Sequence, residues 1–176
     1  MLKHRKQISA VKEANCLDKV TNLKAEDLQD VGVKYLALDF DGVLASHGKE
    51  KPLSEVRDWL SGFALSFGEE NIFILSNKPT QERLEFFKDK YPKIRFIAGV
   101  AKKPYPDGML KIRDTLNCKT ADIALVDDRL LTGCLACIIA GSFPILITKP
   151  YVDNENYDTK EKFFSFLRKW EQKIFF

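Results

Sequence analysis

A run of apolar residues that ends in two closely spaced carboxylates constrains the fold of this chain more than any other feature. Residues 35–38, Tyr-Leu-Ala-Leu, lead directly into Asp39-Phe40-Asp41-Gly42. An unbroken apolar run of this length is typical of a strand buried on both faces of a parallel sheet, and ligands of such sheets lie beyond the carboxyl ends of the strands. Asp39 and Asp41 repel each other unless a cation or a shared proton lies between them, so the pair indicates a divalent metal, an acid/base couple, or both. Taken alone, the short motif is equally typical of a solvated Asp-Gly turn.

The composition predicts one globular domain over residues 1–176. With 176 residues, 45% of them hydrophobic, the chain can bury a sizeable core. A net charge of +3 is too small to indicate a nucleic-acid partner, although residues 1–20 form a basic N-terminal segment. We expect its locally basic start, Lys3, His4, Arg5 and Lys6, to be a solvated tail. Residues 1–15 lack the apolar core of a signal peptide, and no stretch approaches the length of a transmembrane helix. We therefore expect a cytoplasmic protein, with a peripheral position at a membrane as the alternative.

The cysteines show one spacing of interest, Cys134-x-x-Cys137, which lies within the apolar stretch 130–139. Two small thiols on a buried helix are the favoured interpretation of this pair. A redox-active pair is the minor alternative.

Apolar periodicity along the rest of the chain alternates between the strand and helix patterns. Leu53, Val56, Leu60, Phe63 and Phe67 recur at helical spacing, which is the clearest amphipathic helix. The predicted strands are 35–38, 72–75, 94–98, 122–126 and 143–148, and the predicted helices are 21–32, 53–67, 79–91, one marked by Met109, Ile112 and Leu116, and one ending at Ala140. This alternation predicts an α/β fold, a three-layer Rossmann-like doubly wound sandwich with a mainly parallel five-stranded sheet.

Chemically reactive side chains follow four of the predicted strands. They are Asp39 and Asp41, Ser76 and Asn77, Lys103, and Asp127 and Asp128. Because these loops meet at one edge of a parallel sheet, we expect carboxylates that hold a divalent cation to face a lysine, a hydroxyl and helix N-termini that bind phosphate. Such a pocket suits phosphoryl transfer, in which one Asp attacks phosphorus and a second acid protonates the leaving oxygen and then activates water. Ser76, Asp127 and Asp128 have an alternative explanation as helix N-caps.

These four motifs, in this order, resemble those of haloacid dehalogenase (HAD) superfamily phosphatases. The matching segments are Asp39-Phe40-Asp41-Gly42-Val43-Leu44, Leu75-Ser76-Asn77, Lys103-Pro104 and Val126-Asp127-Asp128, within residues 16–150. The resemblance implies that Asp39 is the nucleophile, that Asp41 is the general acid/base, and that Lys103 neutralises charge. It also implies phosphate contacts from Ser76, Asn77 and Lys103. The implied cofactor is Mg²⁺, bound by Asp39, the Asp41 carbonyl and Asp128, with Asp127 sharing or supporting the coordination.

A narrower resemblance is to the capless subclass III branch that contains phosphatidylglycerophosphate (PGP) phosphatases. It rests on residues 32–34 (Gly-Val-Lys), Arg83, 101–104 (Ala-Lys-Lys-Pro) and 130–132 (Leu-Leu-Thr). The chain departs from this branch in having Asp127 where Gly is usual, Gly133 where a further Asp is usual, and Ile-Ile at 138–139 in place of Asn-Arg. These departures keep open the alternative that the chain is a catalytically degenerate binding module.

The presence or absence of a cap domain over the predicted active site limits which substrates can reach it. The stretches from Asp39 to Ser76 and from Ser76 to Lys103 each accommodate one helix and one strand, which leaves no room for a cap domain. An uncovered site admits large substrates, so we expect a lipid phosphate at a membrane surface, with PGP first. A phosphoprotein is the second expectation and a small soluble phosphate the third.

Residues 158–176 predict a C-terminal amphipathic helix, with Asp158 and Glu161 placed as its N-cap and capping-box partner. Phe163, Leu167, Trp170 and Ile174 form an apolar face that we expect to pack on the domain. Aromatics and cations on one helix also suit an anionic lipid surface, and that is the alternative role.

Overall fold

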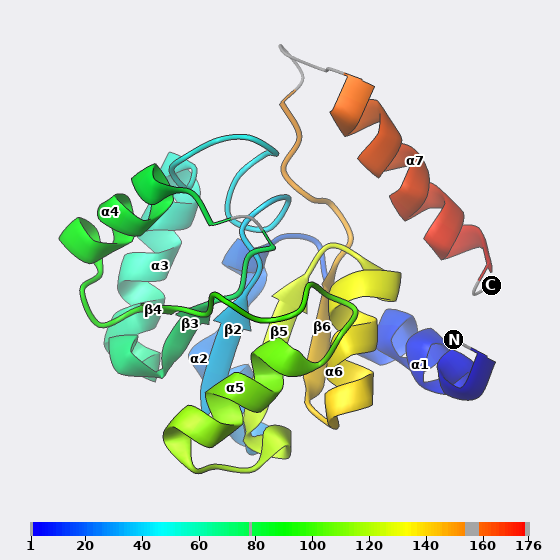
Figure 1. The fold of residues 1–176 in the computed structure, drawn as a ribbon, viewed down its shortest axis with the longest axis horizontal. Helices are drawn as coiled ribbons and strands as arrows, with labels where there is room; N and C mark the ends of the chain where they lie inside the picture. Colours follow the sequence, from blue (N-terminus) through cyan, green and yellow to red (C-terminus); the bar gives the residue numbers. More distant parts are fainter. Residues whose placement is uncertain (1, 78, 154–158, 175–176) are drawn as a thin grey trace.

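One parallel sheet with helices on both faces forms the body of the protein (Figure 1). The structure is a computed structural model that describes residues 2–77, 79–153 and 159–174. The strands are β1 (Cys16–Leu17), β2 (Tyr35–Leu38), β3 (Ile72–Ile74), β4 (Arg95–Phe96), β5 (Ile123–Asp127) and β6 (Phe143–Ile147). The α-helices are α1 (Arg5–Ala14), α2 (Ala25–Asp30), α3 (Ser54–Phe67), α4 (Gln81–Lys90), α5 (Asp107–Leu116), α6 (Leu135–Ala140) and α7 (Thr159–Ile174), and a π-helical turn, η5 (Leu130–Cys134), precedes α6. Short 3₁₀ turns lie at Leu2–His4, Val20–Asn22, Glu69–Asn71 and Thr120–Asp122.

The predicted fold class is confirmed, with one correction to the sheet. Its six strands run parallel in the order β1-β6-β5-β2-β3-β4, whereas the sequence predicted five. The additional strand is β1, which pairs with β6 through bonds such as that from the Thr148 N–H to the Leu17 carbonyl at 2.8 Å. Two residues are too few to show an apolar period, so only the docking of this segment on β6 reveals it as a strand.

Alternate residues of the central strands face two different helical layers. In β2, Leu36 and Leu38 pack into the core beneath α2, α3 and α4, while Ala37 packs into the core beneath α5 and α6. This explains why β2 reads as continuously apolar. Figure 1 shows α5 and α6 in front of the sheet, with α3 behind it.

The basic cluster at the N-terminus corrects a second expectation in part, since it lies in helical structure although Lys3, Arg5 and Lys6 remain exposed. In α1 the side chain of Ile8 is fully buried and that of Val11 nearly so. They pack with Leu130, Leu135 and Leu146, which extends the layer containing α6 beyond the centre of the sheet. Two apolar residues three positions apart suffice to seat a helix whose remaining face is basic.

Several predicted boundaries shift without changing the element. The predicted helix 21–32 is a 3₁₀ turn followed by α2, and the predicted strand 94–98 shortens to β4. Helix α3 matches its prediction closely and ends at Gly68, whose φ of 91° favours glycine.

The strand order reverses beside β2, and this position determines where a ligand can bind. From β2 the chain continues outward through β3 and β4, and then returns to β5 on the other side of β2. The crevice at the carboxyl ends of β2 and β5 is therefore the topological switch point of the sheet, the usual ligand site of such folds. Asp39 follows β2 directly and Asp127 is the last residue of β5.

Helix α7 lies against η5, next to the edge of this crevice. Among the described residues, none of the helices has both the length and the apolar character needed to cross a membrane.

Candidate active site

A buried lysine bridges two carboxylates at the switch point. The Nζ atom of Lys103 lies 2.8 Å from Oδ1 of Asp39 and 2.5 Å from Oδ2 of Asp127. The side chains of Lys103 and Asp127 are only 4% and 1% exposed, whereas that of Asp39 is 13% exposed. Asp39 is thus the member of this trio that retains access to solvent. The arrangement presents a carboxylate nucleophile against a fixed positive charge.

Three carboxylates converge in the same place and form the strongest candidate for a metal site. Asp39, Asp127 and Asp128 each offer an oxygen, and these oxygens all lie within 4.8 Å of one another. Hard oxygen donors at this spacing fit a divalent cation such as Mg²⁺. The sequence predicted these residues, and the structure brings them together from the ends of two adjacent strands.

The pKa values of the charged residues in this pocket are shifted by burial and by their neighbours. Burial raises the pKa of Asp39 to about 8, with the charges of Asp127 and Asp128 adding to the effect and Lys103 opposing it. Burial likewise raises the pKa of Asp128 to about 7. For Lys103, burial alone would lower the pKa, but the charges of Asp127 and Asp39 outweigh it and raise the pKa above its usual value. Burial and the mutual repulsion of the carboxylates thus disfavour their charged forms, which suits a pocket built to take a further cation.

Gly42 allows the loop after β2 to pass directly over Asp128. Its φ is 85°, and a Cβ atom at this position would lie 2.5 Å from Oδ2 of Asp128. Both the backbone conformation and the close approach therefore require glycine here. The Gly in the Asp-Phe-Asp-Gly motif thus serves the packing of the carboxylate pocket as well as the turn.

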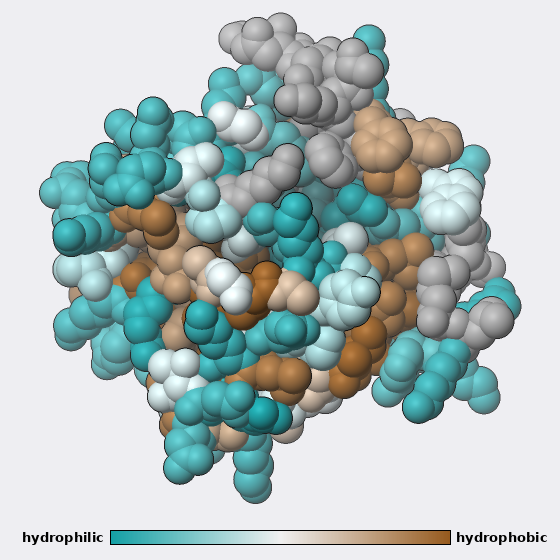
Figure 2. Space-filling model, viewed as in Figure 1, coloured by the Kyte–Doolittle hydropathy of each residue, from teal (hydrophilic) through white to brown (hydrophobic). Residues whose placement is uncertain are grey.

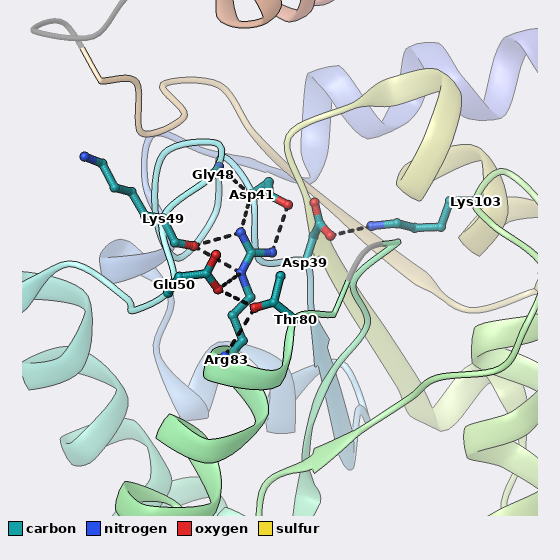
Figure 3. A network of polar contacts seen from close by, with 8 residues as sticks. All are labelled: Asp39, Asp41, Gly48, Lys49, Glu50, Thr80, Arg83 and Lys103. Carbon is teal, nitrogen blue, oxygen red and sulfur yellow. Dashed lines mark hydrogen bonds and ion pairs between the residues drawn. The ribbon is translucent and has the colours of Figure 1, made fainter.

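The carboxylate of Asp41 faces an arginine rather than the three-carboxylate cluster (Figure 3). Arg83 donates from both terminal nitrogens, at 2.8 Å to Oδ1 and 3.1 Å to Oδ2 of Asp41. The guanidinium is held in turn by the Lys49 carbonyl and lies 3.9 Å from the centre of the Phe40 ring. Arg83 belongs to α4, so this helix positions the carboxylate of Asp41, which lies two residues after Asp39 in the chain.

Sequence reasoning noted Arg83 as part of a resemblance but gave it no role. A signal was present, because Arg83 lies four residues before Phe87 and so shares its helix face. Phe87 and Arg83 are 1% and 3% exposed. A cation on a core-facing position needs a carboxylate partner.

Ser76 and Asn77 lie at the same sheet edge, after β3. Ser76 is buried, with 7% of its surface exposed, while Asn77 is exposed. The side-chain oxygen of Asn77 accepts a hydrogen bond of 3.2 Å from the backbone N–H of Lys103. Asn77 therefore ties the loop carrying Lys103 to the loop after β3.

The Asp127 side chain fills the volume that a side chain at position 133 would need. A Cβ atom added to Gly133 would lie well inside 3.0 Å of the Asp127 carboxyl group. The Asp127 side chain is fixed there by Lys103 and by the backbone N–H of Arg129, which donates to Oδ1 at 2.9 Å. The two departures from the PGP phosphatase pattern, at positions 127 and 133, therefore depend on each other. Asp127 contributes a carboxylate from the end of β5, and the glycine at 133 in η5 leaves room for it.

The C-terminal helix reaches the pocket through a charged pair. Arg168 donates to Oδ2 of Asp128 at 2.7 Å, and the two side chains are 7% and 3% exposed. One turn further on, Glu171 accepts hydrogen bonds from the Arg129 side chain and, at 3.4 Å, from the Leu131 N–H. Sequence reasoning missed both Arg168 and Glu171, because isolated charges on a helix normally mark its solvated face.

The helix docks on the domain as expected, but the predicted face is corrected in part. Phe163 and Trp170, members of that face, are 57% and 47% exposed, while Leu167 is half-buried and the side chain of Ile174 lies outside the described residues. The buried charges of Arg168 and Glu171 hold the helix instead. Oppositely charged partners on the domain decide the orientation. The predicted capping pair does not bear on this point, since Asp158 and the side chain of Glu161 lie outside the described residues.

Comparison with known proteins gives one family and several similar folds. Residues 2–152 match the family described as mitochondrial PGP phosphatase. The crystal structure of an uncharacterized protein from Corynebacterium glutamicum aligns with a TM-score of 0.50 at 19% identity, covering 74% of this chain and 92% of that chain, which shows a shared fold. A HAD hydrolase from Entamoeba histolytica aligns with a TM-score of 0.44 at 18% identity, covering 71% of this chain and 88% of that chain. Comparison with curated proteins gave no match.

Proposed function

This chain belongs to the PGP phosphatase family, and from that premise we propose that it hydrolyses a lipid phosphate monoester through a phosphoenzyme on Asp39. The family assignment confirms that it is a phosphatase of the HAD type. The lipid substrate, the aspartyl-phosphate and the Mg²⁺ requirement are the further parts of the proposal. The observation that carries them is the solvent-accessible Asp39 carboxylate, held against Lys103 beside two buried carboxylates at the switch point.

In the proposed first step, a carboxylate oxygen of Asp39 attacks phosphorus and the bond from phosphorus to the ester oxygen breaks. Asp41 gives its proton to the departing alcohol oxygen. In the second step Asp41 takes a proton from water, the water oxygen attacks phosphorus, and inorganic phosphate leaves with Asp39 regenerated. Arg83 fixes the Asp41 carboxylate in position, two residues after Asp39, which supports this role.

Cations and hydroxyls would stabilise the charge on the transferred group. Lys103 is fixed by two carboxylates and adds a positive charge next to Asp39. Ser76 lies at the same edge and is proposed to bind a phosphate oxygen, with Asn77 keeping the Lys103 loop in place. Mg²⁺ held by Asp39, Asp128, Asp127 and the Asp41 carbonyl would neutralise phosphate charge and orient the group for attack.

The elements around the pocket support a capless enzyme with a large substrate. Between Asp39 and Ser76 the described chain forms a loop, α3, a 3₁₀ turn and β3, and between Ser76 and Lys103 it forms α4 and β4. These elements belong to the layers of the sandwich. Water exclusion would then depend on the substrate and its surroundings. A phospholipid in a bilayer meets this need, and PGP is the first candidate, with a peripheral membrane location.

The catalytic reading is favoured over a degenerate binding module by the matched pair at positions 127 and 133. Gly133, where a further Asp is usual in this branch, is the departure that most favours the binding module. Asp127 places a carboxylate in the space that a side chain at 133 would need. This supports a carboxylate pocket that is assembled in a different way.

The test presents PGP in vesicles, phosphopeptides and phosphosugars to the same purified protein, with and without Mg²⁺. We expect the highest kcat/KM on PGP, loss of turnover in Asp39→Asn, and an acid-stable, hydroxylamine-labile phosphate on the wild-type protein. A preference of tenfold or more for phosphopeptides, about 1.4 kcal/mol of transition-state binding, would overturn the lipid assignment. Turnover at the wild-type rate in Asp39→Asn would overturn the mechanism.

A further inference from the structure

Among its described side chains, helix α7 buries two charged residues and exposes three aromatic ones. Its residues Arg168 and Glu171 are 7% and 2% exposed, while Phe163, Phe166 and Trp170 are 57%, 63% and 47% exposed. Surface helices usually bury their apolar stripe and solvate their charges. Aromatic residues that are exposed on a helix held by buried ion pairs indicate a surface that contacts a partner.

The exposed aromatics form one continuous stripe. Phe163, Phe166 and Trp170 are spaced three and four residues apart, so they lie on one face of the helix. Arg168 and Glu171 are spaced three apart and lie on a different face, toward Asp128 and η5. The helix can therefore keep its contacts with the pocket while its stripe contacts something else.

Apolar residues continue onto the neighbouring helix. In α6 Ile139 is 45% exposed and Ile138 half-buried. Figure 2 shows apolar side chains over α6 and over α7 on the same face of the molecule. Ile138 packs against the buried cluster that contains Ile8 and Val11, so Ile139 is the member of the isoleucine pair that extends the exposed apolar surface.

Cations border this face from two elements. Lys162 and Lys173 are exposed on α7, and Lys3, Arg5 and Lys6 are exposed at the start of α1. Both α1 and α7 contact η5, so the basic N-terminal cluster lies near the same part of the molecule. Exposed apolar and aromatic residues flanked by lysines and arginines complement a surface that is apolar below and anionic above.

We propose that the stripe of Phe163, Phe166 and Trp170, with Ile139 and the bordering cations, docks on an anionic phospholipid bilayer. The inference rests on the proposed lipid phosphatase function for its purpose, since the docked bilayer supplies the substrate. The attraction of each cation to an anionic surface, together with aromatic side chains at the headgroup level, favours a bilayer over a protein partner. Because one helix carries both the stripe and Arg168, docking brings the headgroups to within about one helix diameter, roughly 10 Å, of the carboxylate pocket.

The experiment measures cosedimentation of the full chain, without substrate, with vesicles of phosphatidylglycerol and phosphatidylcholine or of phosphatidylcholine alone. We expect binding at least tenfold tighter to the anionic vesicles, weakened by salt. The double variant Phe166→Ser/Trp170→Ser should lose at least tenfold in vesicle binding while hydrolysing a soluble aryl phosphate at the wild-type rate. Leu65→Ser is the matched control, because Leu65 is a 90% exposed apolar residue on α3, and it should change neither property.

Three results would overturn the docking surface. These are no binding of the wild type to anionic vesicles, equal binding by the double variant, or a dimer in sedimentation velocity that the double variant abolishes without any effect on vesicles. The last result would assign the stripe to a second copy of the chain. Binding is measured without turnover, so stripe-dependent binding together with inactivity toward lipid phosphates would sustain the docking surface and refute only the proposed substrate.

Discussion

Gly133 and Asp127 compete for one volume at the end of β5, and this competition predicts a strongly non-additive pair of substitutions. In Gly133→Ala the new methyl group would lie well inside 3.0 Å of the Asp127 carboxyl. Asp127 cannot easily move, because it is 1% exposed and bonded to Lys103 and to the Arg129 N–H. Overpacking costs about 1–3 kcal/mol. Weakening a hydrogen bond to a charged group adds about 1.5–3 kcal/mol, so we expect a loss of roughly 3–5 kcal/mol in the free energy of unfolding.

The same substitution should be harmless once the aspartate is gone. Asp127→Gly removes the carboxyl group and also the Cβ atom, which would itself crowd a methyl at 133. The φ of Gly133 lies outside the left-handed region, so alanine fits its backbone. In that background Gly133→Ala should be neutral or stabilise the protein by up to about 1 kcal/mol, the usual gain of alanine over glycine in a helix.

Equilibrium urea unfolding of the wild type, the two single variants and the double variant gives the coupling energy directly. We expect about 3 kcal/mol or more. If Gly133→Ala costs the same in both backgrounds to within about 0.5 kcal/mol, the two positions do not share a space and the reasoning is refuted.

Three further predictions concern the charged groups around the pocket. Arg83→Gln should lower kcat on an aryl phosphate by about 10²-fold with little change in KM, because Asp41 loses the partner that positions it. Arg168→Gln should tighten Mg²⁺ binding in calorimetric titration by about tenfold, because Arg168 no longer competes for the Asp128 carboxylate. Asp128→Asn should weaken Mg²⁺ binding more than Asp127→Asn, since Asp127 is already engaged by a lysine and a backbone N–H.

Each of these has a contrary outcome. An unchanged kcat in Arg83→Gln would mean that the reaction does not depend on the position of Asp41. Weaker Mg²⁺ binding in Arg168→Gln, with no change in the exposed control Lys173→Gln, would make the arginine a support of the pocket and not a competitor. Stronger dependence on Asp127 than on Asp128 would reverse the metal assignment.

The sequence by itself determined the sheet and the collection of reactive residues at its edge. Apolar runs that end in Asp39, Ser76 and Asp127 must place those residues together once the strands are parallel, because the carboxyl ends of parallel strands share an edge whatever the loops between them do. The gathering of Asp39, Lys103 and the acidic pair was predictable for this reason.

Contacts between residues distant along the chain were decided only by the tertiary structure. The strand Cys16–Leu17 is too short to show a period, and it exists because β6 offers an open edge. The pairing of Asp41 with Arg83 requires α4 to lie beside the loop after β2. The mutual fit of Asp127 and Gly133 is a matter of a few ångströms that no spacing encodes.

Helix α7 shows the limit most clearly. Its sequence period correctly indicated an amphipathic helix, and the apolar stripe was the natural choice for the buried face. The structure buries Arg168 and Glu171 instead. At the edge of the pocket, Arg168 pairs with Asp128 and Glu171 pairs with Arg129. Periodicity defines the faces of a helix, but the free energy of burying each face depends on what the rest of the protein places opposite it, and buried partners of opposite charge can reverse the usual choice.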